Sequence, residues 1–290
     1  MEITWLAFFT QLLNGLVLGL TFALLAIGLS IIFGMLSVVN FAHGAFYMMG
    51  AYFAIFAVSM TGNFWVALVL SFLSVGLVGM VTEYFTLKPL YGKDHILPLL
   101  ITFGLSMVFV GIIHLIFGST PKSLKVPDFI SGPINLGLIY YSKYNLFVLL
   151  CGSILIVLVW LLIEKTNLGM LIRAGTQDRM MARGLGINVD RLFTLVYGIG
   201  TGLAALGGVI SAPIRGAYPE MGMEILIQSF VVVTVGGMGS FWGSIVAALL
   251  IGEAITISIL VWPPLASISI YLLMALILLI KPEGLFGRRV

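Results

Sequence analysis

The feature that most constrains the fold is a series of long, uninterrupted apolar runs joined by short polar connections. Only 9% of the residues are charged, against roughly 25% in a soluble domain. A bilayer core takes about 20 apolar residues for each helical crossing, so the runs predict membrane-spanning segments. They fall at about 10–33, 45–60, 63–85, 96–118, 144–163, 192–212, 225–237, 241–261 and 266–280.

The runs are rich in Leu, Ile, Ala and Gly and do not alternate with polar residues. This pattern is typical of helices and not of a transmembrane barrel. We therefore predict an all-α, polytopic membrane protein with eight or nine crossings, folded as one domain over residues 1–290. Three runs are short and adjoin Gly or Pro, so we expect tilted or broken helices at 45–60, 225–237 and 266–280.

The distribution of charge predicts the orientation of the chain. With nine crossings, the connections 86–95 and 164–191 and the C-terminal tail share one side and hold ten of the 14 Lys and Arg residues. The positive-inside bias makes that side cytoplasmic and places the N-terminus outside. The net charge of +3 gives no reason to expect a nucleic-acid partner, and the single cysteine, Cys151, cannot form an internal disulfide.

Small residues predict close helix packing. Gly15, Gly19 and Ala23 are spaced four residues apart and share one face of the first run. In lipid, such faces allow helix backbones to approach closely. We expect this packing within the subunit or against another subunit.

A dense group of glycines in VGGMGSFWGS predicts a break between two helices. Gly236, Gly237 and Gly239 are too close together for an unbroken helix, and the hydroxyl of Ser240 could cap the next one. The break could be a tight turn between packed helices, or non-helical backbone that faces a water-filled path.

Two polar residues interrupt the apolar stretch VVNFAHGAFYMMGAY. We predict that Asn40 caps a helix that begins near Phe41 and that Gly44 allows close packing. His43 could make a structural hydrogen bond or line a translocation path. Glu253, the only carboxylate deep in a predicted crossing, has the same two interpretations.

The chain lacks the patterns expected of an enzyme. It has no nucleotide-binding loop and no H-E-x-x-H motif, and its three histidines do not form a metal-ligand spacing. We expect no catalytic residue, metal or cofactor in this chain. A membrane enzyme would need a cluster of titratable groups near one interface. An ion-coupled secondary transporter, the main alternative function, would need several intramembrane acids, whereas Glu83 and Glu164 lie near the ends of runs.

The connection 164–191 carries the strongest functional signal. Met180, Met181 and Leu185 form a short apolar stripe among five basic residues, and glycines follow it. We predict a short amphipathic helix on the cytoplasmic side that docks on a partner or lies on the membrane; a solvated turn is the alternative. The candidate residues of this segment are Arg173, Asp178, Arg179, Met181, Arg183, Gly184, Gly186 and Asp190.

Four stretches resemble one family along nearly the whole chain. They are NGLVLGLTFALLAIGLSIIFGMLSVVNFAHGAFYMMGAY, TNLGMLIRAGTQDRMMARGLGINVDR, VVTVGGMGSFWGSIVAALLIGEA and PEGLFGR. Together they are similar to branched-chain amino acid ABC transporter permeases of the LivH type. The resemblance implies an importer subunit in a bacterial or archaeal plasma membrane. Its partners would be a second, LivM-like permease, two ATP-binding cassette subunits that use ATP and Mg, and an extracytoplasmic substrate-binding protein.

The resemblance also implies roles for particular positions. Asp178 and Gly184 stand where the family's coupling loop has its acid and its glycine, whereas Arg179 and Met180 replace alanines. ATP hydrolysis by docked subunits would then move this segment and switch a central path between outward and inward access. Many relatives have an acid after the FAHG motif where this chain has Ala45, and relatives of this architecture are also associated with amides, urea and aromatic acids.

Overall fold

Each of the nine apolar runs forms one helix in the computed structural model, which describes residues 5–94, 96–135, 137 and 139–287. Seven of these helices are long and apolar enough to cross a membrane, whereas α9 and α11 are shorter. The predicted all-α membrane fold is confirmed. The helices are α1 (Trp5–Leu36), α2 (His43–Thr61), α3 (Phe64–Thr82), α4 (Ile96–Phe117), α5 (Lys143–Lys165), α8 (Val189–Arg215), α9 (Met221–Gly236), α10 (Phe241–Val261) and α11 (Leu265–Ile280).

Short elements lie in the connections between these helices. A π-helix, η1 (Glu83–Leu87), and a 3-10 helix, η2 (Lys88–Leu90), extend α3, and a second 3-10 turn, η3 (Asp128–Ile130), precedes an antiparallel hairpin. In that hairpin β1 (Pro133–Asn135) pairs with β2 (Tyr140–Ser142), with Pro133 opposite Ser142. Between α5 and α8 the chain forms α6 (Asn167–Gln177) and α7 (Arg179–Gly184).

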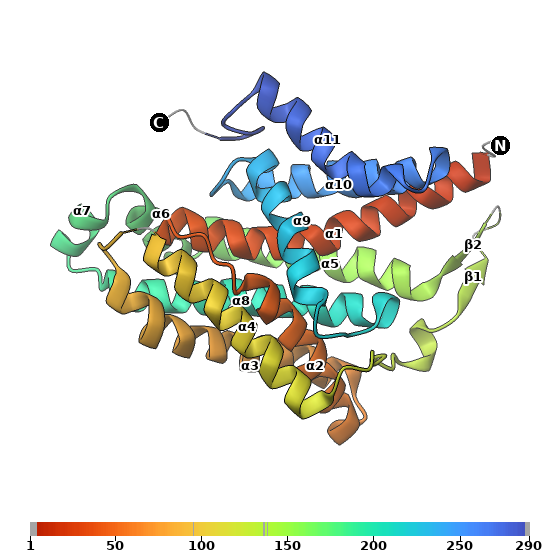
Figure 1. The fold of residues 1–290 in the computed structure, drawn as a ribbon, viewed down its shortest axis with the longest axis horizontal. Helices are drawn as coiled ribbons and strands as arrows, with labels where there is room; N and C mark the ends of the chain where they lie inside the picture. Colours follow the sequence, from red (N-terminus) through yellow and green to blue (C-terminus); the bar gives the residue numbers. More distant parts are fainter. Residues whose placement is uncertain (1–4, 95, 136, 138, 288–290) are drawn as a thin grey trace.

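Most connections lie at one of two ends of the helical bundle, whereas the turn before α2 is buried at Val38, Asn40 and Ala42. Figure 1 shows α6 and α7 at one end, and the β hairpin and the start of α1 at the other. The opposite positions of the segment 164–191 and the start of α1 agree with the topology predicted from the charges. The segment 164–191 therefore lies at the end of the bundle opposite the hairpin.

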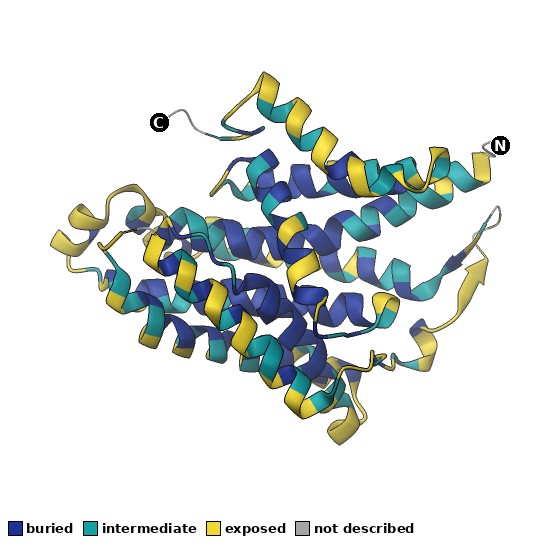
Figure 2. Ribbon diagram, in the orientation of Figure 1, coloured by how far each residue is buried: buried dark blue, intermediate teal, exposed yellow. Residues whose placement is uncertain are grey.

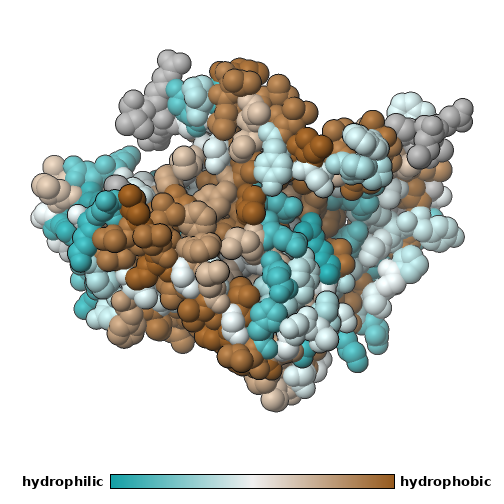
Figure 3. Space-filling model, viewed as in Figure 1, coloured by the Kyte–Doolittle hydropathy of each residue, from teal (hydrophilic) through white to brown (hydrophobic). Residues whose placement is uncertain are grey.

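The bundle is built around α1 and α8, which are buried along most of their length (Figure 2). In contrast, α4 and α5 keep most of their side chains on the surface. That surface is apolar over much of the face seen in Figure 3. Leu115 in α4 is 88% exposed and Leu279 in α11 is 82% exposed. An apolar surface of this extent suits lipid or neighbouring subunits and not water.

Glycines bring the helix backbones together, as predicted. A methyl group added at Gly50 would overlap the backbone of Ala205, which joins α2 to α8. A methyl group at Gly19 would lie 2.9 Å from the Cα of Leu249, which joins α1 to α10. Close approach of this kind increases van der Waals contact where no hydrophobic effect holds helices together.

Candidate functional site

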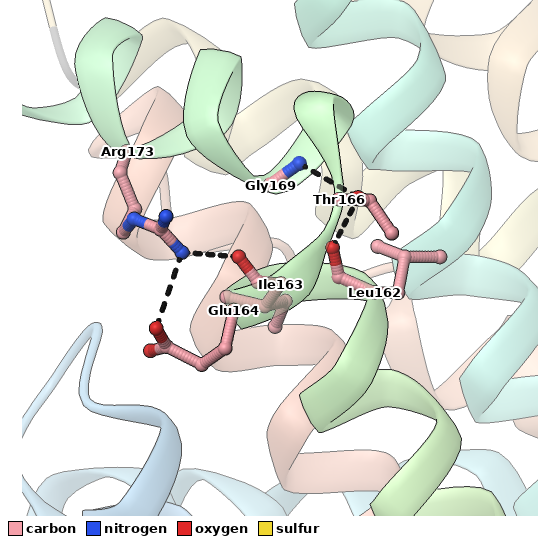
Figure 4. Close-up of polar contacts among 6 residues, drawn as sticks. All are labelled: Leu162, Ile163, Glu164, Thr166, Gly169 and Arg173. Carbon is pink, nitrogen blue, oxygen red and sulfur yellow. Dashed lines mark hydrogen bonds and ion pairs between the residues drawn. The ribbon is translucent and has the colours of Figure 1, made fainter.

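The corner between α5 and α6 is braced by polar contacts (Figure 4). Thr166 caps α6 by accepting a hydrogen bond at 3.2 Å from the backbone N–H of Gly169. The Arg173 guanidinium donates to the carbonyl oxygen of Ile163 and lies 3.4 Å from the carboxylate of Glu164. Arg173 thus satisfies one of the carbonyls left open at the end of α5. Arg173 therefore ties α6 to the end of α5.

The predicted amphipathic segment consists of two helices and not one continuous helix. Asp178 has extended backbone angles, and its side chain caps α7 by accepting 2.9 Å hydrogen bonds from the backbone N–H groups of Met180 and Met181. An Asp at this position ends one helix and starts the next. As predicted, glycines terminate the segment: α7 ends at Gly184, and Gly186 has a φ of 83°.

Three apolar side chains of this segment remain on the surface. Met180, Met181 and Leu185 are 85%, 62% and 75% exposed. We refer to these three residues as the α7 patch. The helix α7, which carries Met180 and Met181, lies at the end of the bundle opposite the β hairpin (Figure 1). Exposed apolar groups on a polar segment suit either a groove in a partner protein or the membrane surface.

Arg179 attaches α7 to the end of α1. Its guanidinium donates to the carbonyl oxygen of Met35 at 2.7 Å and to the hydroxyl of Ser37 at 3.3 Å. The same group lies over the ring of Phe193 in α8, 5.1 Å from its centroid. A second contact links α7 to α8, because Arg183 and Asp190 form an ion pair at 2.7 Å. The segment is therefore held to two central helices.

The turn that follows α1 differs from the prediction for Asn40. Helix α2 begins at His43 and not near Phe41, and its N-cap residue, Ala42, makes no side-chain cap. Asn40 is fully buried, and its side chain accepts a 3.1 Å hydrogen bond from the backbone N–H of Ala42. The backbone N–H of Phe41 donates to Thr102 in α4 at 3.2 Å. Asn40 thus closes a turn before the helix, because Phe41 and Ala42 are not yet part of it.

His43 and Gly44 lie at the packed start of α2. His43 is fully buried, and its Nε2 donates to the carbonyl oxygen of Leu25 at 3.0 Å, while Nδ1 has no partner among the described residues. Gly44 lies against the carbonyl of Gly222 in α9. Nearby, Phe41 borders a cavity of about 20 Å³, which is no larger than one water molecule requires.

The glycine break after α9 has the predicted form. Gly236 ends α9, and Gly237 and Gly239 have φ angles of 99° and 82°. Ser240 caps α10 by accepting a 3.1 Å hydrogen bond from the backbone N–H of Gly243. The break is thus a turn between two packed helices.

The C-terminal tail covers this break. The backbone N–H of Leu285 donates to the carbonyl of Val235 at 2.8 Å, and that of Phe286 donates to the carbonyl of Gly236 at 3.0 Å. These bonds satisfy the last carbonyls of α9. The backbone of the break is therefore covered by protein.

Glu253 lies on α10 against α1. Its carboxylate carbon would be 2.6 Å from a methyl group added at Gly15, so the glycine makes room for it. Both carboxylate oxygens are buried without a hydrogen-bond partner among the described residues. Glu253 lies beside Gly15, whereas His43 bonds to Leu25, ten positions further along α1.

Glu83 is a buried acid that sequence reasoning placed only near the end of a run. Its side chain has no exposed surface, and its carboxylate accepts hydrogen bonds from the hydroxyls of Tyr91 and of Thr194, the latter at 2.5 Å. Burial, together with the hydrogen bond to Glu83, raises the pKa of Tyr91 far above its usual value, so Tyr91 stays protonated as a donor. The sequence feature that could have identified Glu83 is its position as a carboxylate inside the apolar run 63–85.

Comparison with known proteins gives the identity of the fold family. Residues 11–280 match the family described as the permease component of the branched-chain amino acid transport system. The high-affinity branched-chain amino acid transport system permease protein BraD of Pseudomonas aeruginosa is 28% identical over 292 residues, which cover 96% of this chain and 95% of BraD. The permease protein LivH of the same type of system in Escherichia coli K12 is 28% identical over 303 residues, which cover 98% of this chain and 97% of LivH. The relatives are transport permeases and not enzymes, so the expected non-enzymatic membrane role is confirmed. The chain belongs to the family of permease components of branched-chain amino acid transport systems.

Proposed function

We propose that this chain is the permease subunit of an ABC importer that carries branched-chain or related apolar amino acids across the plasma membrane of a bacterium or archaeon. It would form the path with a second, LivM-like permease. Two ATP-binding cassette subunits, which hold ATP and Mg, would drive transport from the cytoplasmic side. A substrate-binding protein would deliver the amino acid from outside.

The α7 patch carries this proposal. It consists of three exposed apolar side chains on a polar segment, and a groove in a partner subunit would cover them. The segment is held to α1 by Arg179, to α8 by the ion pair of Arg183 and Asp190, and to α5 by Arg173. A force applied to the patch would therefore reach three crossing helices. These features support a coupling segment driven by a docked ATPase.

The substrate assignment rests on the relatives, whose names specify branched-chain amino acids. The buried residues around Phe41 and Ala45 are mainly apolar in this chain. An apolar path would suit an amino acid with a hydrocarbon side chain, because transfer of that side chain from water to apolar surroundings is favourable. The small cavity beside Phe41 would have to widen, and we propose that this happens when the two permeases change state.

Reconstitution of the complete complex in proteoliposomes tests the function. The liposomes should contain this chain, the second permease and the ATP-binding subunits, with ATP inside and the binding protein and radiolabelled L-leucine outside. We expect uptake that requires ATP. Uptake by this chain alone along an ion gradient, without ATP, would instead support the ion-coupled transporter.

A charge placed in the α7 patch tests the docking role. Met181→Glu should abolish co-purification of the ATP-binding subunits, because docking would bury an unpaired carboxylate. Met238→Glu is the matched control, since Met238 is 55% exposed in the connection between α9 and α10, at the same end of the bundle. If only Met238→Glu fails to co-purify the ATP-binding subunits, the docking surface is not on α7.

A further inference from the structure

A buried carboxylate joins three parts of the chain near the coupling segment. Glu83 lies where α3 passes into the π-helix η1, and it has no exposed surface. Tyr91, which follows η2, donates to one carboxylate oxygen, and Thr194 in the second turn of α8 donates to the other at 2.5 Å.

The two hydroxyl donors also contact the coupling segment through neighbouring residues. The ring of Tyr91 meets the ring of Phe193 edge to face, with 5.3 Å between centroids. Arg179 of α7 lies over that same Phe193 ring. Thr194 is also 3.2 Å from the carbonyl oxygen of Asp190, whose side chain pairs with Arg183 of α7. Both routes from α7 therefore end at Glu83.

A carboxylate at this position resists sliding between α3 and α8. Apolar side chains can move past one another with little change in contact energy, whereas a buried acceptor that loses a donor is left unsatisfied. The cost is larger for a charged acceptor in an apolar interior. Glu83 therefore favours joint movement of α3, α8 and the Tyr91 loop over separate movement.

The geometry points to Glu83 as a positioning residue that transmits the displacement of α6 and α7 to α3. This inference rests on the proposed function, because it requires a driven coupling segment. It assigns a transport role to a residue outside both the coupling segment and the path candidates. Glu83 acts through Tyr91 and Thr194 and touches neither substrate nor ATP.

The number of ATP molecules hydrolysed per L-leucine imported by the complete complex in proteoliposomes measures this role. Tyr91→Phe and Thr194→Val each remove one hydroxyl and keep the side-chain shape, and Glu83→Ala removes both bonds. We expect the ratio to rise by about two- to thirtyfold in these variants, the range given by coupling energies between linked sites. Glu83→Gln should restore a ratio close to wild type, since Thr194 can donate to Asp190 and accept from the amide.

Two matched controls separate transmission from general damage. Tyr84→Phe removes a hydroxyl from an exposed ring in η1, and Thr86→Val removes a hydroxyl that donates to the carbonyl oxygen of Thr82 in the preceding turn. Both should keep the wild-type ratio. The ratio is normalised to assembled complex, so a purely structural role would lower the thermal stability of the complex and leave the ratio unchanged.

The outcomes distinguish this inference from the proposed function. If the wild-type complex is coupled and Tyr91→Phe and Thr194→Val have the wild-type ratio, Glu83 does not transmit movement and only this inference fails. A rise in the ratio for the two controls as large as for Tyr91→Phe would also reject it. If the wild-type complex imports no L-leucine with ATP, the proposed function fails and this inference fails with it.

Discussion

The guanidinium of Arg179 donates a 2.7 Å hydrogen bond to the carbonyl oxygen of Met35, so the coupling segment holds the last turn of α1. Ser37, which follows that turn, has a φ of 53° and also lies within 3.3 Å of Arg179. The chain then enters the buried turn at Asn40 and begins α2. One side chain therefore connects the segment that would meet the ATPase with the turn that joins two central helices.

Replacement of Arg179 by Ala should weaken this connection. The variant loses two hydrogen bonds from a charged donor and a cation–π contact with Phe193, together worth about 1–3 kcal/mol at a partly exposed position. A difference of this size changes the attached population of α7 by about 5- to 150-fold. We expect ATP-driven uptake to fall while ATP hydrolysis continues, as measured by both assays on the same proteoliposomes.

The control for Arg179 is Arg191→Ala. Arg191 is exposed, carries the same charge and lies at the start of α8, at the same end of the bundle. Its removal should leave both uptake and hydrolysis near wild type. Equal losses of uptake in the two variants would mean that uptake depends on the basic charge at this end of the bundle and not on the contact with Met35.

The N-cap that Asp178 provides gives a second prediction. It is independent of the first because the cap stabilises only α7 itself. Replacement by Ala removes the N-cap of α7 and should cost about 1 kcal/mol of helix stability, whereas Asn keeps an equivalent cap. We expect faster amide hydrogen exchange at Met180 and Met181 in Asp178→Ala but not in Asp178→Asn. If the Asn variant loses coupling while its exchange stays normal, the carboxylate charge would have a role beyond capping.

The fold could largely be predicted from the sequence because membrane crossings depend on local composition. All nine apolar runs became helices, and the break after Gly236 with its cap at Ser240 was also correct. The start of α2 was wrong, since the motif around Asn40 indicates a polar turn but not whether the next two residues are helical. Asp178 similarly divides the predicted single helix, because a capping Asp and an interior Asp look alike in sequence.

The candidate site was less predictable because it depends on contacts between distant residues. The role of Glu83 requires Thr194, which is 111 positions away in the chain. No local sequence pattern indicates that Glu83 and Thr194 lie close together in space. Glu253 was correctly identified as an unusual intramembrane acid, yet its neighbour, Gly15, lies on the first helix. Local sequence therefore indicates which residues are unusual, whereas the fold determines what they contact.

Gly44 should tolerate no larger residue. A methyl group there would overlap the backbone carbonyl of Gly222 and separate α2 from α9. Overpacking of this kind typically costs 1–3 kcal/mol or more, so Gly44→Ala should lower the midpoint of thermal unfolding in detergent. Gly104→Ala is the matched control, since Gly104 lies in α4 and, within the part of the chain that the structure describes, no atom is within 4 Å of an added methyl group. It should gain about 0.5–1 kcal/mol from helix propensity; similar losses in both variants would contradict the packing argument.

Gly92 and Gly284 have nearly the same backbone angle. Comparing their Ala variants therefore distinguishes the loss of tail packing from the effect of backbone strain. Gly92 has a φ of 79° and Gly284 a φ of 80°, so replacement by Ala strains both by about 1–2 kcal/mol. At Gly92 no atom of the described residues lies within 4 Å of the added methyl group, whereas at Gly284 the methyl group would lie 2.6 Å from the carbonyl oxygen of Thr234. Only Gly284→Ala should therefore lift the tail from the glycine break and expose the carbonyl of Gly236. We expect Gly284→Ala to make the tail cleavable by added protease and to lower the unfolding midpoint several degrees further than Gly92→Ala does. If the two variants unfold at the same temperature and resist protease equally, the tail does not stabilise the break.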